Sequence, residues 1–116
     1  MSVYTCRQAV VRSWLTENDI RAMVISSAAN IRYLSGFTGE GHLVLVAGGG
    51  GICTDSRYEL QAAEEAPALE CVLSSDGHLG AVIEYARGQD VESLGFEDNA
   101  VTYAAYRRLE DEFGAG

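Results

Sequence analysis

Arg57 is the residue whose type and position most directly suggest chemistry with a ligand. It lies in the segment Thr54–Tyr58 and follows Asp55 and Ser56, two residue types that often begin a helix. A helix N-terminus carries positive potential, so a cation in the first turn needs another reason to be there. A guanidinium group binds carboxylates and carbonyl groups through paired hydrogen bonds. Arg57 is therefore predicted either to contact a substrate or partner chain, or to form a structural ion pair with Asp55 or Glu59.

A second segment with functional character is Asn30–Gly39, which combines polar residues, glycines and aromatic rings. The Asn30 side chain can bond backbone groups at a turn or helix start, and the glycines permit crowded or left-handed backbone. Tyr33 and Phe37 add large apolar faces. These residue types fit a loop that packs tightly and exposes one wall, but they also fit a simple connection between two elements.

The histidines and cysteines form weaker patterns. His42 and His78 are distant in the sequence and lack companion ligands at metal-binding spacing, so we expect solvated or capping roles. The three cysteines are widely spaced and predict small buried hydrophobic residues in a reducing cytoplasm, with a reactive thiol as the alternative. Cys53 is expected across a hairpin from His42, but nothing marks a third group that would orient such a pair.

Composition excludes several function classes. The formal net charge is −9, so a phosphate backbone would be repelled and nucleic acid is an unexpected partner. The same argument disfavours a nuclease site built from Asp55 and Glu97. The glycine clusters at 36–41 and 48–51 lack the strand–turn–helix context of a phosphate-binding loop. The sequence shows neither an apolar run long enough to span a membrane nor a secretory signal.

The apolar pattern predicts the scaffold that positions these residues. Helices are expected over 5–17, 30–34, 56–66, 79–87 and 103–113, and strands over 20–25, 42–47, 51–54, 69–73 and 93–96. Thr5, Ser56 and Thr102 are the expected helix caps, and Gly48–Gly51 is the expected turn of a hairpin. Strands alternating with helices, with one hairpin, predict a single α/β domain over 1–116 with a mixed sheet of five or six strands flanked by helices.

Several short motifs occur together in a characteristic order along the chain. They are Asp19–Ile25, Asn30–Gly39, Thr54–Tyr58, Gln61-Ala62 and Gly95–Glu97. In this combination the chain resembles the N-terminal domain of the creatinase/prolidase/aminopeptidase P metallopeptidases, and it looks most like the Xaa-Pro peptidases of that family. The resemblance implies a ribonuclease-H-like fold.

The resemblance also implies where a site would lie. In the family, the loop matched by Asn30–Gly39 lies near the mouth of the active site. The arginine matched by Arg57 reaches towards a substrate cleft, often that of the neighbouring subunit. The candidate residues for a substrate cleft or an interface are therefore Asn30, Tyr33, Phe37, Asp55, Arg57 and Tyr58.

Metal chemistry is implied only for a second domain. Catalytic domains of the family hold two divalent ions, commonly manganese, cobalt or zinc, through Asp, Glu and His ligands, and these ions activate a water for attack on an amide. We expect those ligands outside these 116 residues, so this chain should contain no catalytic residue or metal and hydrolyse nothing by itself. The implied partners are its own C-terminal catalytic domain, a second copy in a homodimer, and short proline-containing peptides.

Other interpretations of the sequence remain open. The chain is also compatible with a free-standing binding module on the same fold, or with the N-terminal domain of a creatinase-like amidinohydrolase or of an inactive relative. The motifs do not separate aminopeptidase from dipeptidase activity.

Overall fold

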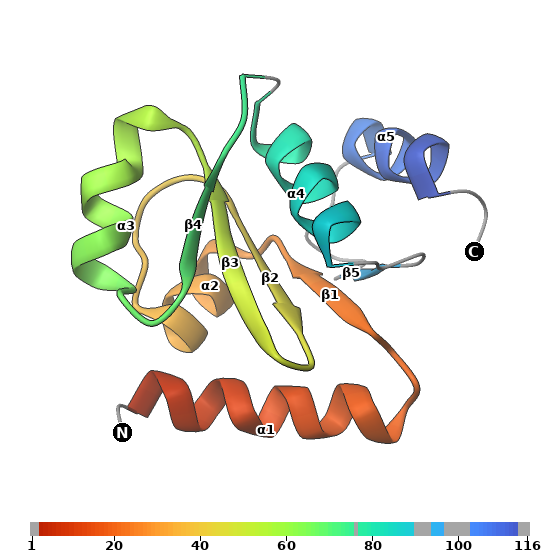
Figure 1. Ribbon diagram of the computed structural model, residues 1–116, viewed down its shortest axis with the longest axis horizontal. Coiled ribbons are helices and arrows are strands. Elements are labelled where there is room, and N and C mark those ends of the chain that lie inside the picture. The colour runs from red at the N-terminus through yellow and green to blue at the C-terminus, as the bar shows by residue number, and fades with distance from the viewer. Residues whose placement is uncertain (1–2, 76, 90–93, 97–102, 114–116) are drawn as a thin grey trace.

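The structure of the protein is a computed structural model that describes residues 3–75, 77–89, 94–96 and 103–113. Its helices and strands alternate along the chain (Figure 1). The helices are α1 (Val3–Glu17), α2 (Ala28–Ser35), α3 (Glu59–Glu65), α4 (Gly77–Gly88) and α5 (Tyr103–Phe113), with a 3₁₀ turn η1 (Ser56–Tyr58) before α3. The strands are β1 (Ala22–Ile25), β2 (His42–Val46), β3 (Gly49–Thr54), β4 (Glu70–Leu73) and β5 (Gly95–Phe96).

The five described strands form one mixed sheet in the order β4-β3-β2-β1-β5. The central strands β1, β2 and β3 pair antiparallel, and the outer strands β4 and β5 join parallel to β3 and β1. The β2–β3 hairpin places His42 directly opposite Cys53, as expected. The predicted α/β class and mixed sheet are therefore confirmed.

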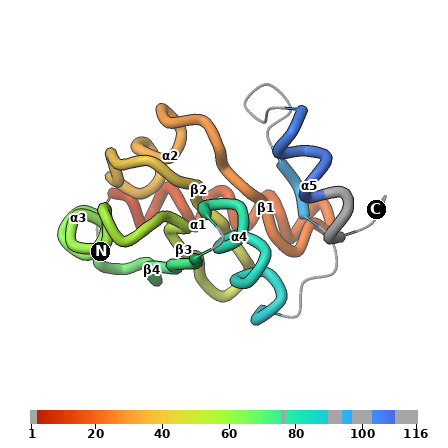
Figure 2. Tube along the Cα trace, turned by 90° about the horizontal axis from the view of Figure 1, so that it is seen from above, coloured from red at the N-terminus to blue at the C-terminus, as the bar shows by residue number. Residues whose placement is uncertain are grey.

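Helices cover both faces of the sheet, which makes a three-layer domain. Figure 2 shows α2 and α4 on opposite sides of the strands. Helix α4 packs over β2, β3 and β4, and α5 packs beside α4. Helices α1, α2 and α3 cover the other face of the sheet. Both faces are buried because the strand residues alternate between two apolar clusters.

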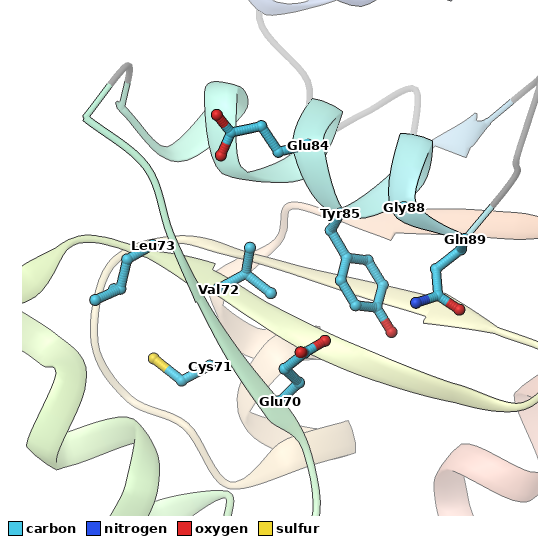
Figure 3. Close-up of a pocket in the computed structure, with 8 residues that line it drawn as sticks. All are labelled: Glu70, Cys71, Val72, Leu73, Glu84, Tyr85, Gly88 and Gln89. Atoms are coloured by element: carbon cyan, nitrogen blue, oxygen red, sulfur yellow. The ribbon is translucent and has the colours of Figure 1, made fainter.

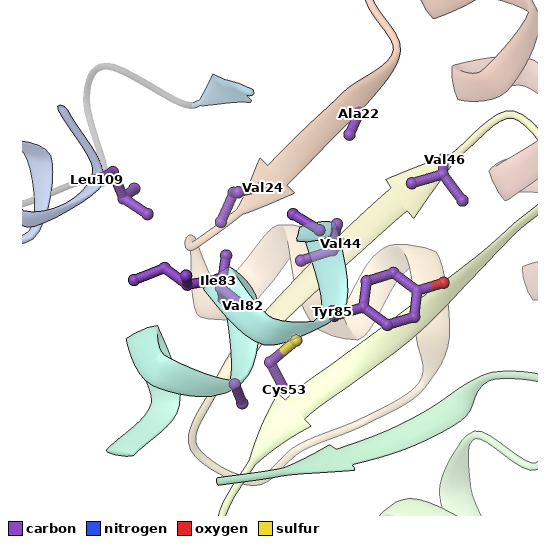
Figure 4. Close-up of a cluster of buried hydrophobic side chains, with 11 residues drawn as sticks. Ala22, Val24, Val44, Val46, Cys53, Val82, Ile83, Tyr85 and Leu109 are labelled. Carbon is purple, nitrogen blue, oxygen red and sulfur yellow. The ribbon is translucent and has the colours of Figure 1, made fainter. Parts of the chain in front are cut away.

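Successive residues of the central strands point alternately into the two clusters. Val24 and Val44 point towards α4, together with Cys53 (Figure 4). Leu43 and Leu45 point to the other face, where they join residues of α1, α2 and α3. Leu43, Val44 and Leu45 are all fully buried, so β2 lies at the centre of the molecule.

Helix ends follow local chemistry, with some differences from the sequence prediction. Ser27 accepts a hydrogen bond from the backbone of Asn30 and caps α2, and Gly36 ends that helix in the left-handed conformation at φ 83°. Helix α2 is longer than the helix predicted over 30–34. The predicted Thr5 cap is wrong, because α1 already begins at Val3 and Thr5 lies inside it.

Two other expectations need correction. Ser56 does not open a long helix; Asp55 is the capping residue, and the 3₁₀ turn η1 precedes α3. The glycines at 49–51 are not a turn, because β3 already begins at Gly49. The predicted Thr102 cap, the start of the fifth strand at Ser93, and Glu97 of the last motif all lie outside the described residues.

Candidate functional site

Asp55 is the centre of a polar cluster at the end of β3. Its Oδ1 accepts hydrogen bonds from the backbone N–H and from Nε of Arg57, each at 3.0 Å, and its Oδ2 accepts one from Nη2 of Arg57 at 3.0 Å. The backbone bond caps η1, and the two side-chain bonds form a bidentate ion pair. The ion pair with Asp55, one of the two sequence interpretations of Arg57, is therefore present.

A histidine from another element completes the carboxylate's contacts. Nε2 of His78, in the first turn of α4, lies 2.6 Å from Oδ2 of Asp55. The hydrogen bonds from Arg57, and then that from His78, hold the pKa of Asp55 well below its ordinary value. The same pairing raises the pKa of Arg57. The carboxylate thus stays ionised and ties the end of β3 to the start of α4.

Arg57 keeps part of its guanidinium open to solvent. Its side chain is 69% exposed, with Nη2 3.7 Å from the Glu40 carboxylate and the guanidinium carbon 5.3 Å from the Tyr58 ring centre. Among the described residues, no acceptor takes a hydrogen bond from its Nη1. Arg57 is therefore positioned by Asp55 and retains donor capacity for a further carboxylate or carbonyl group.

His42 joins the same cluster, which sequence reasoning missed. Its Nδ1 lies 3.0 Å from the Ser26 hydroxyl, and its ring meets that of His78 edge-on, with ring centres 6.5 Å apart. Burial, and then the neighbouring His78, lower the pKa of His42 below 6.5. The two histidines are partly buried and paired rather than solvated. No sequence pattern signalled this, because β2 and the N-terminus of α4 meet only through the sheet.

The aromatic residues lie behind the polar cluster. Phe37 is 1% exposed and meets the Tyr58 ring edge-on at 6.3 Å between centres. The following loop is held to α3, because the Thr38 backbone N–H donates to Glu65 at 2.9 Å and Gln61 donates to the Thr38 hydroxyl at 2.8 Å. The Thr38 backbone bond is also the largest cause of a lowered pKa at Glu65.

Asn30 and Tyr33 lie elsewhere, on α2. They line an apolar groove of about 430 Å³ between α1, α2 and β1. The Arg7 guanidinium stacks over the Tyr33 ring at 4.0 Å, and its Nη1 donates to the Tyr33 carbonyl at 2.9 Å. The six candidate residues therefore divide into one group around Asp55 and Arg57 and another beside α1.

A further cavity of about 340 Å³ lies between β4 and α4 (Figure 3). Its lining includes Glu70 and Cys71 from the edge strand and Glu84 and Tyr85 from α4. Burial and the nearby Glu70 raise the pKa of Tyr85, so its hydroxyl stays protonated near neutral pH. This arrangement offers neither an activated nucleophile nor a cationic group.

The three cysteines lie in three different environments. Cys53 is buried and Cys71 partly buried, but Cys6 is exposed, which corrects the expectation that all three are buried; all are free thiols. Burial strongly raises the pKa of Cys53, so its thiol stays protonated.

Within the described ranges, His, Cys, Asp and Glu side chains nowhere form a group of three that could hold a metal ion. The described residues therefore do not fit the implied two-metal centre.

None of the helices in the described part of the chain is both long and apolar enough to cross a bilayer.

The comparisons with known proteins agree with this architecture. The family model of the creatinase/prolidase N-terminal domain matches residues 7–116. An uncharacterized peptidase, YqhT of Bacillus subtilis (strain 168), is 30% identical over 97 residues, which cover 83% of this chain and 28% of that protein. The chain thus spans little more than a quarter of that curated relative.

Several solved structures share the fold along nearly the whole chain, and two of them illustrate the similarity. The N-terminal domain of the cytoplasmic peptidase PepQ from Mycobacterium tuberculosis H37Rv has a TM-score of 0.83 and 32% identity, covering 95% of this chain and 86% of that one. An Xaa-Pro dipeptidase from Bacillus anthracis has a TM-score of 0.88 and 25% identity, covering 97% of this chain and 32% of that one. The layered fold and these matches define the class: the chain belongs to the creatinase/prolidase N-terminal domain family.

Proposed function

We propose that this chain is the non-catalytic N-terminal domain of a metal-dependent Xaa-Pro peptidase of the aminopeptidase P or prolidase type. The supporting observation is the match of the family model to residues 7–116, together with an Xaa-Pro dipeptidase of which this fold forms about a third. The catalytic domain, with its two divalent ions, would be encoded outside the 116 residues. The domain would act in the cytoplasm, as the cytoplasmic peptidase PepQ does.

The role proposed for the domain is to contribute to dimerisation and to restrict the substrate cleft. The Asp55–Arg57 pair supports this role, because a pre-positioned guanidinium with free donor capacity suits the carboxylate or carbonyl groups of a short peptide. The Arg57 guanidinium lies against the Tyr58 ring, which in turn packs edge-on against the buried Phe37. This domain would narrow the entrance to the substrate cleft, and the catalytic domain would hydrolyse the peptide bond.

The proposal is tested by comparing the 116-residue chain with the full reading frame that contains it. Both are assayed on Xaa-Pro dipeptides and on longer peptides with proline second, with Mn²⁺ and with a chelator. We expect metal-dependent hydrolysis only from the longer protein. Turnover by the 116 residues alone, or an inactive longer protein under all these conditions, would refute the proposal.

Arg57 can then be tested in the longer protein. Arg57→Ala is expected to lower kcat/KM by about tenfold, because a charge-assisted hydrogen bond to the peptide is lost. The matched control is Arg21→Ala, an exposed arginine that precedes β1. Equal effects of the two substitutions would show that Arg57 has no specific role at the cleft.

A further inference from the structure

Helix α1 exposes an apolar stripe that nothing in the described structure covers. Val3, Val10 and Trp14 are 53%, 71% and 51% exposed, although all are large apolar residues. With Arg7 and Glu17 they occupy positions 3, 7, 10, 14 and 17, which alternate by four and three residues. This is the spacing of the contact seam between paired helices. The opposite side of α1 carries Leu15 and Gln8, which are buried against the domain.

The stripe borders the groove already described between α1, α2 and β1. Val10 and Trp14 form one wall, Tyr33 forms the other, and Met23 and Ile25 of β1 form part of its lining. Tyr33 is itself 56% exposed. A continuous apolar surface of this kind, in a chain of net charge −9, is typical of a protein interface.

The charges at the ends of the stripe indicate which partner fits. In an antiparallel pairing of two α1 helices centred between Val10 and Trp14, Arg7 faces Glu17 of the partner subunit. In the same register Val10 faces Trp14 of the partner subunit. Each contact occurs twice around a two-fold axis, so a single surface is complementary to itself. A parallel pairing would instead place like charges opposite each other.

Both charged residues are available for this pairing. Arg7 is held at the rim of the groove by its stacking on Tyr33 and its bond to the Tyr33 carbonyl. Glu17 is exposed at the end of α1 and has no ion-pair partner among the described residues.

We propose that the exposed stripe of α1 is the contact surface of an antiparallel homodimer, in which Trp14 of each subunit packs on Val10 and against the groove of the other. The proposal deepens the dimerisation part of the proposed function and rests on it for its biological role. The contact itself belongs to these 116 residues, so it can be tested without any peptidase activity.

The first experiment follows self-association and Trp14 together. Sedimentation velocity over a concentration series measures the dimer, and fluorescence reports burial of Trp14, which is the sole tryptophan. We expect a dimer at high concentration, with Trp14 emission shifting to shorter wavelength as it forms. Trp14→Glu should raise the dissociation constant by at least about tenfold, because it places a charge in the seam. Leu60→Glu, on an 80% exposed residue of α3, is the matched control and should change nothing.

A charge exchange tests the register. Arg7→Glu and Glu17→Arg should each weaken the dimer, and the double variant should restore it, with far-ultraviolet circular dichroism verifying the fold of each. A monomer at all concentrations, which would leave the groove to another segment or partner, overturns the proposal. So does a dimer without a change in Trp14 emission, or a double variant no better than the single ones. The two proposals fail separately. A chain that stays monomeric would refute the dimer but not the peptidase assignment, and an inactive longer protein would refute the peptidase assignment but not the dimer.

Discussion

At the residue scale, Asp55 shows how one side chain links several elements. It caps η1, binds the guanidinium of Arg57 in the same turn, and contacts His78 of α4. The contact with Arg57 was foreseeable, because residues two apart at a helix start are close in any fold. The contact with His78 was not, because it depends on how α4 is placed against the end of β3.

His42 provides a residue-scale prediction about pH. Its folded-state pKa is below its ordinary value of 6.5, chiefly through burial and then through His78. The unfolded chain therefore binds this proton more readily, so the stabilising contribution is complete above pH 6.5 and is lost as the pH falls through the folded-state pKa. Between neutral pH and pH 5, the unfolding free energy should therefore fall less in His42→Gln than in the wild type. Urea titration at each pH measures this difference.

The control for this measurement is the region below pH 4. There Asp55, whose folded-state pKa lies below its ordinary 3.8, loses its contribution in both proteins as the pH falls. An identical pH dependence of wild type and variant above pH 5 would show that His42 does not contribute.

At the element scale, β3 shows why glycines are ambiguous in a sequence. The run at 48–51 predicts a turn, because glycine is common in turns. In the structure Gly50 lies within β3, and a Cβ added to it would be 2.9 Å from the Val44 carbonyl oxygen and 3.1 Å from the side chain of Leu69. The absence of a side chain thus allows close packing on the strand.

The element-scale prediction compares two of these glycines. Gly50→Ala should lower the unfolding free energy by about 1–3 kcal/mol, because the new methyl group overpacks against backbone that cannot move freely. Gly48→Ala meets no atom within 4 Å and should be neutral or slightly stabilising, since alanine restricts the unfolded chain. Urea unfolding measures both. A Gly50→Ala protein as stable as Gly48→Ala would contradict this account of β3.

At the scale of the whole molecule, two cores share one sheet. The cluster beneath α4 and the cluster beneath α1, α2 and α3 both draw residues from β1, β2 and β3. The radius of gyration is 13.0 Å, close to the roughly 13.4 Å expected of a compact domain of this length. Neither core is expected to persist when the other opens.

The molecular-scale prediction is therefore a single unfolding transition that responds to either core. Phe37→Ala should cost about 3–5 kcal/mol and Val82→Ala, on the other face, about 2 kcal/mol. The exposed Leu60→Ala should stay within about 0.5 kcal/mol. Far- and near-ultraviolet circular dichroism in urea should give coincident curves for every variant. Two separate transitions in either core variant would show that the cores unfold independently.

The sequence by itself determined the α/β class, the central strands, most helix positions and the family, because apolar periodicity, helix-ending residues and short motifs are local properties. It also offered the ion pair between Arg57 and Asp55 as one of its interpretations. Only the tertiary structure decided that His42 and His78 meet, and that Asn30 and Tyr33 lie beside α1, away from Arg57. Those contacts depend on strand order and helix placement, which arise from packing between distant segments and leave no mark in any short stretch of sequence.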